Sequence, residues 1–118
     1  MEPMANTIPK AATSAQASDL SRAFIRELIL GSDPQGYVSH CQAIVDASEP
    51  NFPAVQAPAC ILAGDEDMSA PLEGCKYIHE QIGSSKKDLK VLAPCGHWHC
   101  IEQPEKVAKE IDSFCSSL

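Results

Sequence analysis

Two short segments of this 118-residue chain carry side chains suited to acid–base chemistry. Residues 64–67 read Gly-Asp-Glu-Asp after an apolar run at residues 59–63, and His97 follows a second apolar stretch ending at Leu92. A histidine accepts a proton near neutral pH, and a buried carboxylate on its other ring nitrogen fixes the tautomer and stabilises the imidazolium. The two segments therefore predict the acid and the base of a hydrolytic triad whose chain order is Ser, Asp and His.

The elements that must position these side chains are two parallel strands. Residues 59–63 are apolar without polar alternation, as in a strand buried on both faces, and residues 89–92 predict a second strand. Helices are predicted at residues 70–82 and 104–115, so the order is strand, helix, strand, helix. This order predicts a right-handed crossover, and the carboxyl ends of both strands then meet at one edge of the sheet, where ligands bind in open α/β folds.

The first half of the chain predicts a different kind of structure. Residues 1–18 lack hydrophobic periodicity and are expected to form a loop or disordered arm. Two helices, capped by Asp19 and Asp33, are predicted within residues 19–50, where they form a helical hairpin. Its predicted apolar faces, which need a cover, are formed by Leu20, Phe24, Ile25, Leu28, Ile29, Tyr37, Cys41, Ile44 and Val45.

Motifs around both chemical segments resemble the α/β-hydrolase superfamily. Residues 58–67, followed by Pro71, are similar to a late strand of that family that ends in Gly-x-x-Asp-x-x-x-Pro. Residues 91–104 are similar to the final strand and its Gly-His turn. The resemblance covers residues 55–118 and implies a partial α/β-hydrolase fold, with two parallel strands, flanking helices and an N-terminal helical hairpin from the cap. Residues 51–118 are then the C-terminal βαβα part of the hydrolase domain.

The resemblance also assigns the site residues. By match to the family motif, Asp67 is the triad acid and His97 is the triad base. Asp65 and Glu66 are interpreted as ordinary acidic residues of a turn, and His99 as a neighbour of the site. The remaining histidines, His40 and His79, lie on predicted helices and are expected at the surface.

The nucleophile of such a triad is missing from these residues. The sequence contains no Gly-x-Ser-x-Gly and no His-Gly-Gly loop for an oxyanion hole, and Ser39 lies within a predicted helix. Residues 24–44 resemble the end of the cap in 3-oxoadipate enol-lactonases, which implies ester or lactone hydrolysis through an acyl-enzyme. Loss of a triad nucleophile lowers turnover by about 10⁶-fold. The chain is therefore expected to have little or no activity alone, with a small ester or lactone as substrate only if the triad is completed.

Two alternatives remain open at this stage. Instead of a segment of an active hydrolase, the chain could be a non-catalytic interaction module that forms a homo-oligomer or pairs with a fuller hydrolase. The other alternative is a truncated product that starts at an internal methionine. Two strands leave unpaired sheet edges and uncovered apolar helix faces, which favours self-association.

Composition narrows the class of partner. The net charge of -7 argues against nucleic acid, because phosphate binding needs clustered Lys and Arg. No apolar stretch approaches the roughly 20 residues of a membrane span, and no secretory signal is present, so a cytoplasmic location is expected.

The cluster of Cys and His at residues 95–100 is spaced too tightly for tetrahedral zinc. The six cysteines lie mostly on predicted apolar faces, so no metal, cofactor or disulfide framework is expected.

Overall fold

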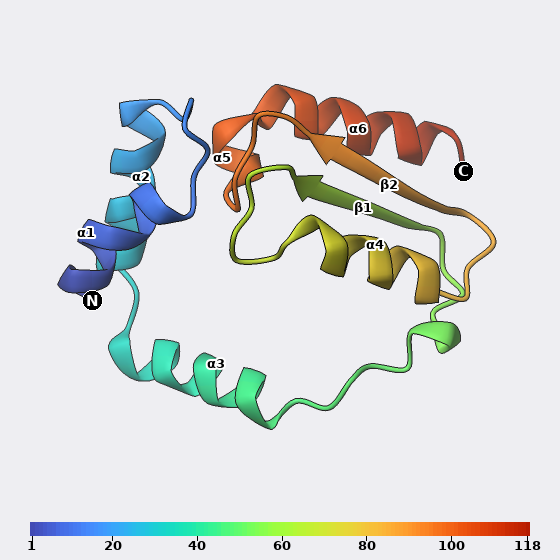
Figure 1. The fold of residues 1–118 in the computed structure, drawn as a ribbon, viewed down its shortest axis with the longest axis horizontal. Helices are drawn as coiled ribbons and strands as arrows, with labels where there is room; N and C mark the ends of the chain where they lie inside the picture. Colours follow the sequence, from blue (N-terminus) through green and yellow to red (C-terminus); the bar gives the residue numbers. More distant parts are fainter.

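The computed structural model describes residues 1–118 and contains helices on both sides of a pair of strands (Figure 1). The helices are α1 (Glu2–Ala11), α2 (Asp19–Leu30), α3 (Pro34–Asp46), α4 (Leu72–Gln81), α5 (His99–Glu102) and α6 (Pro104–Ser116). The strands are β1 (Ala59–Gly64) and β2 (Lys87–Leu92), and a short 3₁₀ turn spans Phe52–Ala54. The predicted order of strand, helix, strand and helix is confirmed, and with it the partial α/β architecture.

The two strands are parallel and pair in register from Ala59 opposite Lys87 to Gly64 opposite Leu92. β2 begins two residues earlier than predicted, because the backbone of its polar first residues still pairs with β1. Helix α4 lies on one side of the strand pair and α6 on the other (Figure 1). Val107 of α6 packs with Leu92 and Cys95 to form a small core between this helix and the end of β2. Both strands consequently end at the same edge, facing α1 and α2.

The predicted loop or disordered arm at residues 1–18 is wrong for most of its length, because residues 2–11 form helix α1. Pro3 is tolerated because the first turn of a helix has no partner for its backbone N–H. Ala5 is buried against Ile25 and Ile29 of α2, so tertiary packing stabilises a helix that has weak local propensity.

The predicted helical hairpin is also corrected. Both helices exist, but α2 packs against α1, while α3 runs separately below them (Figure 1). Ile25 and Ile29 are the buried residues of α2, whereas Leu20 and Phe24 of the predicted stripe are exposed. The sequence pattern indicated that each helix is amphipathic. It did not predict α1, and therefore it did not predict that α2 packs against α1.

The helix caps agree with the prediction at one of two places. The side chain of Asp33 caps α3 by accepting a hydrogen bond from the Gly36 N–H at 2.7 Å. Helix α2 is instead capped by Ser18, whose hydroxyl accepts from the Ser21 N–H at 3.0 Å, and Asp19 is its first helical residue. No residue of α3 is buried.

Candidate active site

Asp67 lies in the turn that follows β1 and is buried. Its Oδ1 accepts hydrogen bonds from the backbone N–H groups of Ser69 at 2.8 Å and Ala70 at 2.9 Å. A short acidic side chain that binds the backbone two and three residues ahead fixes both the turn and its own rotamer. The second oxygen, Oδ2, is thereby aimed at the turn after β2.

His97 lies in that second turn, and its ring contacts Oδ2 of Asp67. Its Nδ1 is 3.0 Å from Asp67 Oδ2, and its backbone N–H donates to the Ala12 carbonyl at 2.9 Å. Because a carboxylate only accepts, Nδ1 carries the proton, which leaves the lone pair on Nε2. The His97 side chain is 45% exposed, and Nε2 makes no hydrogen bond, so it is free to act as a base.

The electrostatic state of Asp67 follows from competing effects. Burial alone would raise the pKa of Asp67, but hydrogen bonds from Ala70, His97 and Ser69 stabilise the carboxylate and together hold the pKa below its ordinary value. Asp67 is therefore ionised at neutral pH.

Gly64 allows the two turns to approach. A Cβ at this last residue of β1 would clash with the carbonyl oxygens of Cys95 and Gly96 in the turn after β2. Glycine is required here because the two backbones approach closely. It is not required for a left-handed conformation, because its φ is not positive. The 30-residue separation between Asp67 and His97 is closed by this contact and by the parallel register.

Two carboxylates to which the sequence analysis gave no role at the site hold the turns in place. Asp65 Oδ1 accepts from the Cys95 N–H at 2.9 Å, so the acid turn and the base turn are joined directly. Glu102 accepts from the Gly96 N–H at 3.1 Å and, through its other oxygen, from the Ser14 N–H at 2.8 Å. These carboxylates position Asp67 and His97. No sequence pattern predicts this role, because their hydrogen-bond partners are backbone groups of distant loops.

Glu66 makes a similar contact with the N-terminal segment. Its Oε2 accepts from the Ala15 N–H at 2.8 Å, and its own N–H donates to the Cys95 carbonyl at 2.9 Å. Asp65 and Glu66 lie in the turn after β1, as predicted, and their carboxylates also accept hydrogen bonds from backbone groups of other segments, which the sequence analysis did not predict.

The other histidines lie away from the dyad. His40 is exposed on α3, and His79 on α4 is half-buried with Nε2 3.4 Å from the Lys87 carbonyl. His99 starts α5 and has its Nδ1 3.4 Å from the Gly96 carbonyl, which makes it a neighbour of the base turn, as predicted.

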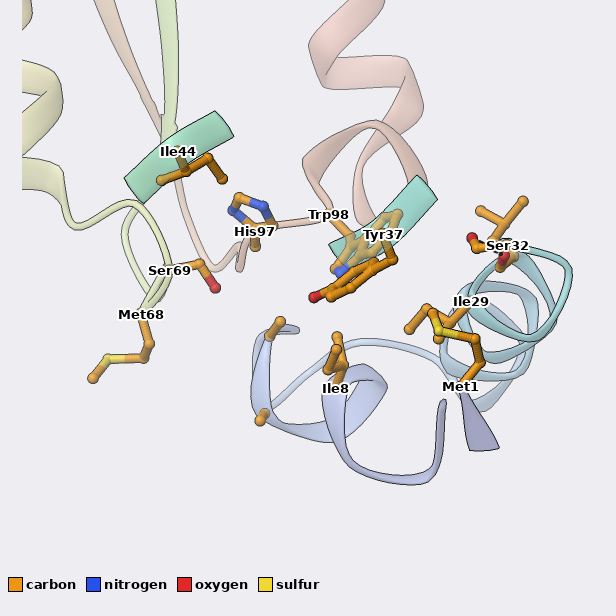
Figure 2. Close-up of a pocket in the computed structure, with 13 residues that line it drawn as sticks. Met1, Ile8, Ile29, Ser32, Tyr37, Ile44, Met68, Ser69, His97 and Trp98 are labelled. Atoms are coloured by element: carbon orange, nitrogen blue, oxygen red, sulfur yellow. Dashed lines mark hydrogen bonds between the residues drawn. The ribbon is translucent and has the colours of Figure 1, made fainter. Parts of the chain in front are cut away.

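A cavity of about 720 Å³ opens beside the imidazole of His97 (Figure 2). Figure 2 shows Ser69 and His97 on one side of this space, with Ile8 of α1 and Ile29 of α2 on the other. Tyr37 of α3 also points into it. The indole N–H of Trp98, another wall residue, is buried and has no hydrogen-bond partner. Sequence reasoning did not predict Trp98 in the wall.

No metal ligand set accompanies the dyad. No group of three or more His, Cys, Asp or Glu side chains is arranged to hold a metal ion, and all six cysteines are free thiols. Burial, reinforced by the Glu102 and Asp65 carboxylates, raises the pKa of the Cys95 thiol to about 11. None of the helices has the length and apolar character needed to cross a membrane.

Known proteins share this arrangement of elements. The structure is similar to an enol-lactonase from Burkholderia xenovorans LB400, with a TM-score of 0.87 and 23% identity over 98% of this chain and 45% of that one. It is also similar to a serine hydrolase involved in carbazole degradation, with a TM-score of 0.81 and 24% identity over 100% of this chain and 48% of that one. The chain has a partial α/β-hydrolase fold.

A sequence comparison finds a similar protein over a shorter stretch. The chain is 31% identical to mouse monoacylglycerol lipase ABHD6 over 68 residues, which are 58% of this chain and 20% of the lipase. No protein-family model matches the sequence. The chain thus spans about half the length of its α/β-hydrolase structural neighbours and a fifth of the mouse protein.

Proposed function

We propose that Asp67 and His97 are the acid and base of a Ser-Asp-His triad that hydrolyses carboxylic esters or lactones. The observation that carries this proposal is the 3.0 Å contact from His97 Nδ1 to a buried, ionised Asp67, with His97 in the wall of a cavity of ligand size. The nucleophilic serine and the oxyanion hole belong, in this proposal, to residues outside these 118. The cytoplasmic location expected from the sequence is part of the same proposal.

The chemistry follows from the geometry of the dyad. His97 Nε2 takes the proton of the serine hydroxyl as the oxygen attacks the ester carbonyl, and the resulting imidazolium is stabilised by the Asp67 carboxylate. The same proton then passes to the leaving alcohol, which gives an acyl-enzyme. In the second half, His97 deprotonates water, which attacks the acyl group and releases the acid and the serine.

The first experiment measures the 118-residue chain alone. We expect no turnover of p-nitrophenyl butyrate above that of the His97→Ala variant, and no covalent labelling by a fluorophosphonate probe, because no activated serine is present. Turnover that His97→Ala abolishes would contradict the expected inactivity.

The second experiment joins the chain to a segment that carries a Gly-x-Ser-x-Gly elbow. The joined protein should hydrolyse the ester and react with the probe, and His97→Ala should lower kcat by about 10⁶-fold. The matched control is His99→Ala, which removes a neighbouring imidazole that does not contact Asp67. Equal effects of the two substitutions would remove His97 from the role of base.

A second candidate function is favoured by a different observation. The sheet has only two strands, so each has an unpaired edge, and Val38, Ile44 and Val45 of α3 are exposed. These features suit a non-catalytic interaction module that pairs with itself or with a fuller hydrolase. Size-exclusion chromatography with light scattering tests it, and a monomer at tens of micromolar would count against it.

A further inference from the structure

The basic side chains of the first half of the chain gather at one place. Residues 1–75 contain only three of them, Lys10, Arg22 and Arg26, and the last two are the only arginines of the whole chain. All three line one pocket of about 250 Å³ between α1 and α2, and no acidic residue lines it. The other lining residues are Ala5, Asn6, Pro9 and Ala23.

Neighbouring groups hold both guanidinium groups in place. Arg22 donates from Nε to Thr13 Oγ1 at 3.2 Å and from Nη2 to the Ser14 carbonyl at 3.0 Å. Arg26 donates from Nε to Asn6 Oδ1 at 3.2 Å. These acceptors are uncharged, so they orient the planar groups without cancelling their charge. A guanidinium has five N–H groups, and each arginine therefore keeps donors for a ligand.

The carboxylates that pair with the two arginines are more exposed than the arginines themselves. Glu27 Oε1 lies 2.9 Å from Arg26 Nη1, and the Glu27 side chain is 70% exposed while that of Arg26 is 39% exposed. Asp19 Oδ1 lies 3.9 Å from Arg22 Nη1, and Asp19 is fully exposed while the Arg22 side chain is 29% exposed. Exposed ion pairs are weak, so the positive charge of the pocket is only partly compensated. Lys10 forms no ion pair.

Oriented arginines beside a free lysine suit a small anion with several acceptor oxygens and more than one negative charge. A phosphate monoester has a charge of about −2 and three acceptor oxygens, and arginine binds such oxygens in pairs. We propose that the pocket between α1 and α2 binds inorganic phosphate or the phosphate group of a monoester. The pocket shares no residue with the cavity beside His97, so this proposal does not rest on the proposed triad.

Titration of the 118-residue chain at pH 8 tests the proposal, with ionic strength held constant by sodium chloride. Because the chain has two arginines, nitrogen-15 NMR resolves the Nε–H groups of Arg22 and Arg26 directly. Inorganic phosphate and methyl phosphate should shift both resonances with a Kd on the order of 1 mM. Dimethyl phosphate, a diester with a single charge, should bind at least about tenfold more weakly because it lacks the second charge.

A matched pair of lysine substitutions tests the location. Lys10 on α1 and Lys109 on α6 are both exposed, and neither forms an ion pair. Lys10→Ala should weaken methyl phosphate binding by about tenfold, as expected for the loss of one hydrogen bond from a charged donor. Lys109→Ala, which removes the same charge elsewhere, should change the affinity by less than about twofold. Thermal melts of both variants should match that of the unsubstituted chain.

A third variant places a negative charge in the pocket. Ala23 lines the pocket and is exposed on α2, so Ala23→Glu should keep the fold and abolish the shifts that phosphate causes. If this variant loses the fold, the two lysine variants still decide the location.

Three results would overturn the proposal: arginine resonances that phosphate does not shift, equal binding of methyl phosphate and dimethyl phosphate, or equal effects of the two lysine substitutions. Shifts that sodium chloride alone reproduces would also overturn it, because they would report screening of charge and not a site. Tighter binding to phosphatidylglycerol vesicles than to methyl phosphate would overturn it in favour of a lipid surface, since that headgroup is a phosphodiester.

Discussion

The two turns that follow β1 and β2 contrast with helix α3, although both contribute to the same cavity. In the turns, the carboxylates of Asp65 and Asp67 accept backbone hydrogen bonds, Glu102 of α5 accepts one from Gly96, and the Cys95 side chain is fully buried. Helix α3 has 13 residues and none of them is buried. The groups that would transfer a proton are therefore fixed by several hydrogen bonds, whereas the part of the wall that α3 supplies has no buried side chain.

This contrast has an energetic basis. A proton transfer needs donor and acceptor within about 0.5 Å of their productive positions, and hydrogen bonds to charged acceptors, worth about 1.5–3 kcal/mol each, supply that order. Contact between hydrocarbon surfaces has no direction, so a wall built from α3 serves with less order. Substitutions in the two regions should accordingly have very different effects.

The largest effect is expected where the two turns touch. Gly64→Ala should reduce the free energy of unfolding by about 4 kcal/mol or more, because the carbonyl oxygens it would meet belong to the backbone of the other turn and cannot move aside cheaply. Gly74→Ala on α4 is the control, since a Cβ there meets nothing within 4 Å, and it should stabilise the protein by about 0.5–1 kcal/mol. Urea unfolding measures both, and destabilisation of similar size in the two variants would contradict the close contact.

An intermediate effect on stability should distinguish α2 from α3, the two helices that were predicted to form a hairpin. Ile25 on α2 is fully buried, so Ile25→Ala should cost about 3 kcal/mol of unfolding free energy. Ile44→Ala on α3 should change it by less than about 0.5 kcal/mol because the side chain is already exposed. The comparison fails if Ile44→Ala is the more destabilising of the two in a thermal or urea melt.

A smaller, pH-dependent effect is expected at Asp67. Its pKa is lower in the folded chain than the ordinary value of 3.8, so the ionised carboxylate stabilises the fold at neutral pH, and this contribution is lost as the pH falls from 3.8 through the lowered pKa. Asp67→Asn should therefore cost about 1–2 kcal/mol at pH 7, and the difference should shrink below about pH 4. Denaturant melts across pH 3–7 measure it.

The same substitution has a spectroscopic signature. An amide in place of the carboxylate presents an N–H to Nδ1, which should move the His97 proton from Nδ1 to Nε2. Nitrogen-15 NMR of the imidazole distinguishes the two tautomers. A stability difference that is constant with pH, or an unchanged tautomer, would contradict an ionised Asp67 that orients His97.

The sequence predicted the second half of the chain well because its signals were local. A continuous apolar strand, a turn with a carboxylate and a Gly-His turn each lie within about ten residues, and parallel strands place their carboxyl ends together without further information. The 3.0 Å contact between Asp67 and His97 has the geometry that these motifs predicted.

The first half was predicted less well because its structure depends on partners. Helix α1 contains Pro9 in its interior, which local propensity disfavours, and it is stabilised by burial of Ala5 against α2. The spacing of Met4 and Ile8, which pack against that core, was the one signal that could have revealed the helix. The positioning carboxylates were missed for the same reason, since their partners lie up to 88 residues away in the chain.

The segment between α1 and α2 links both turns to the helices that line the cavity. The Ala12 carbonyl accepts from His97, while the N–H groups of Ser14 and Ala15 donate to Glu102 and Glu66. The segment therefore connects α1 and α2 to both turns. These helices can separate from the sheet only if the three hydrogen bonds break or if the turn that carries His97 moves with them. A ligand that forces these helices apart is therefore expected to break the three hydrogen bonds or to shift His97 relative to Asp67.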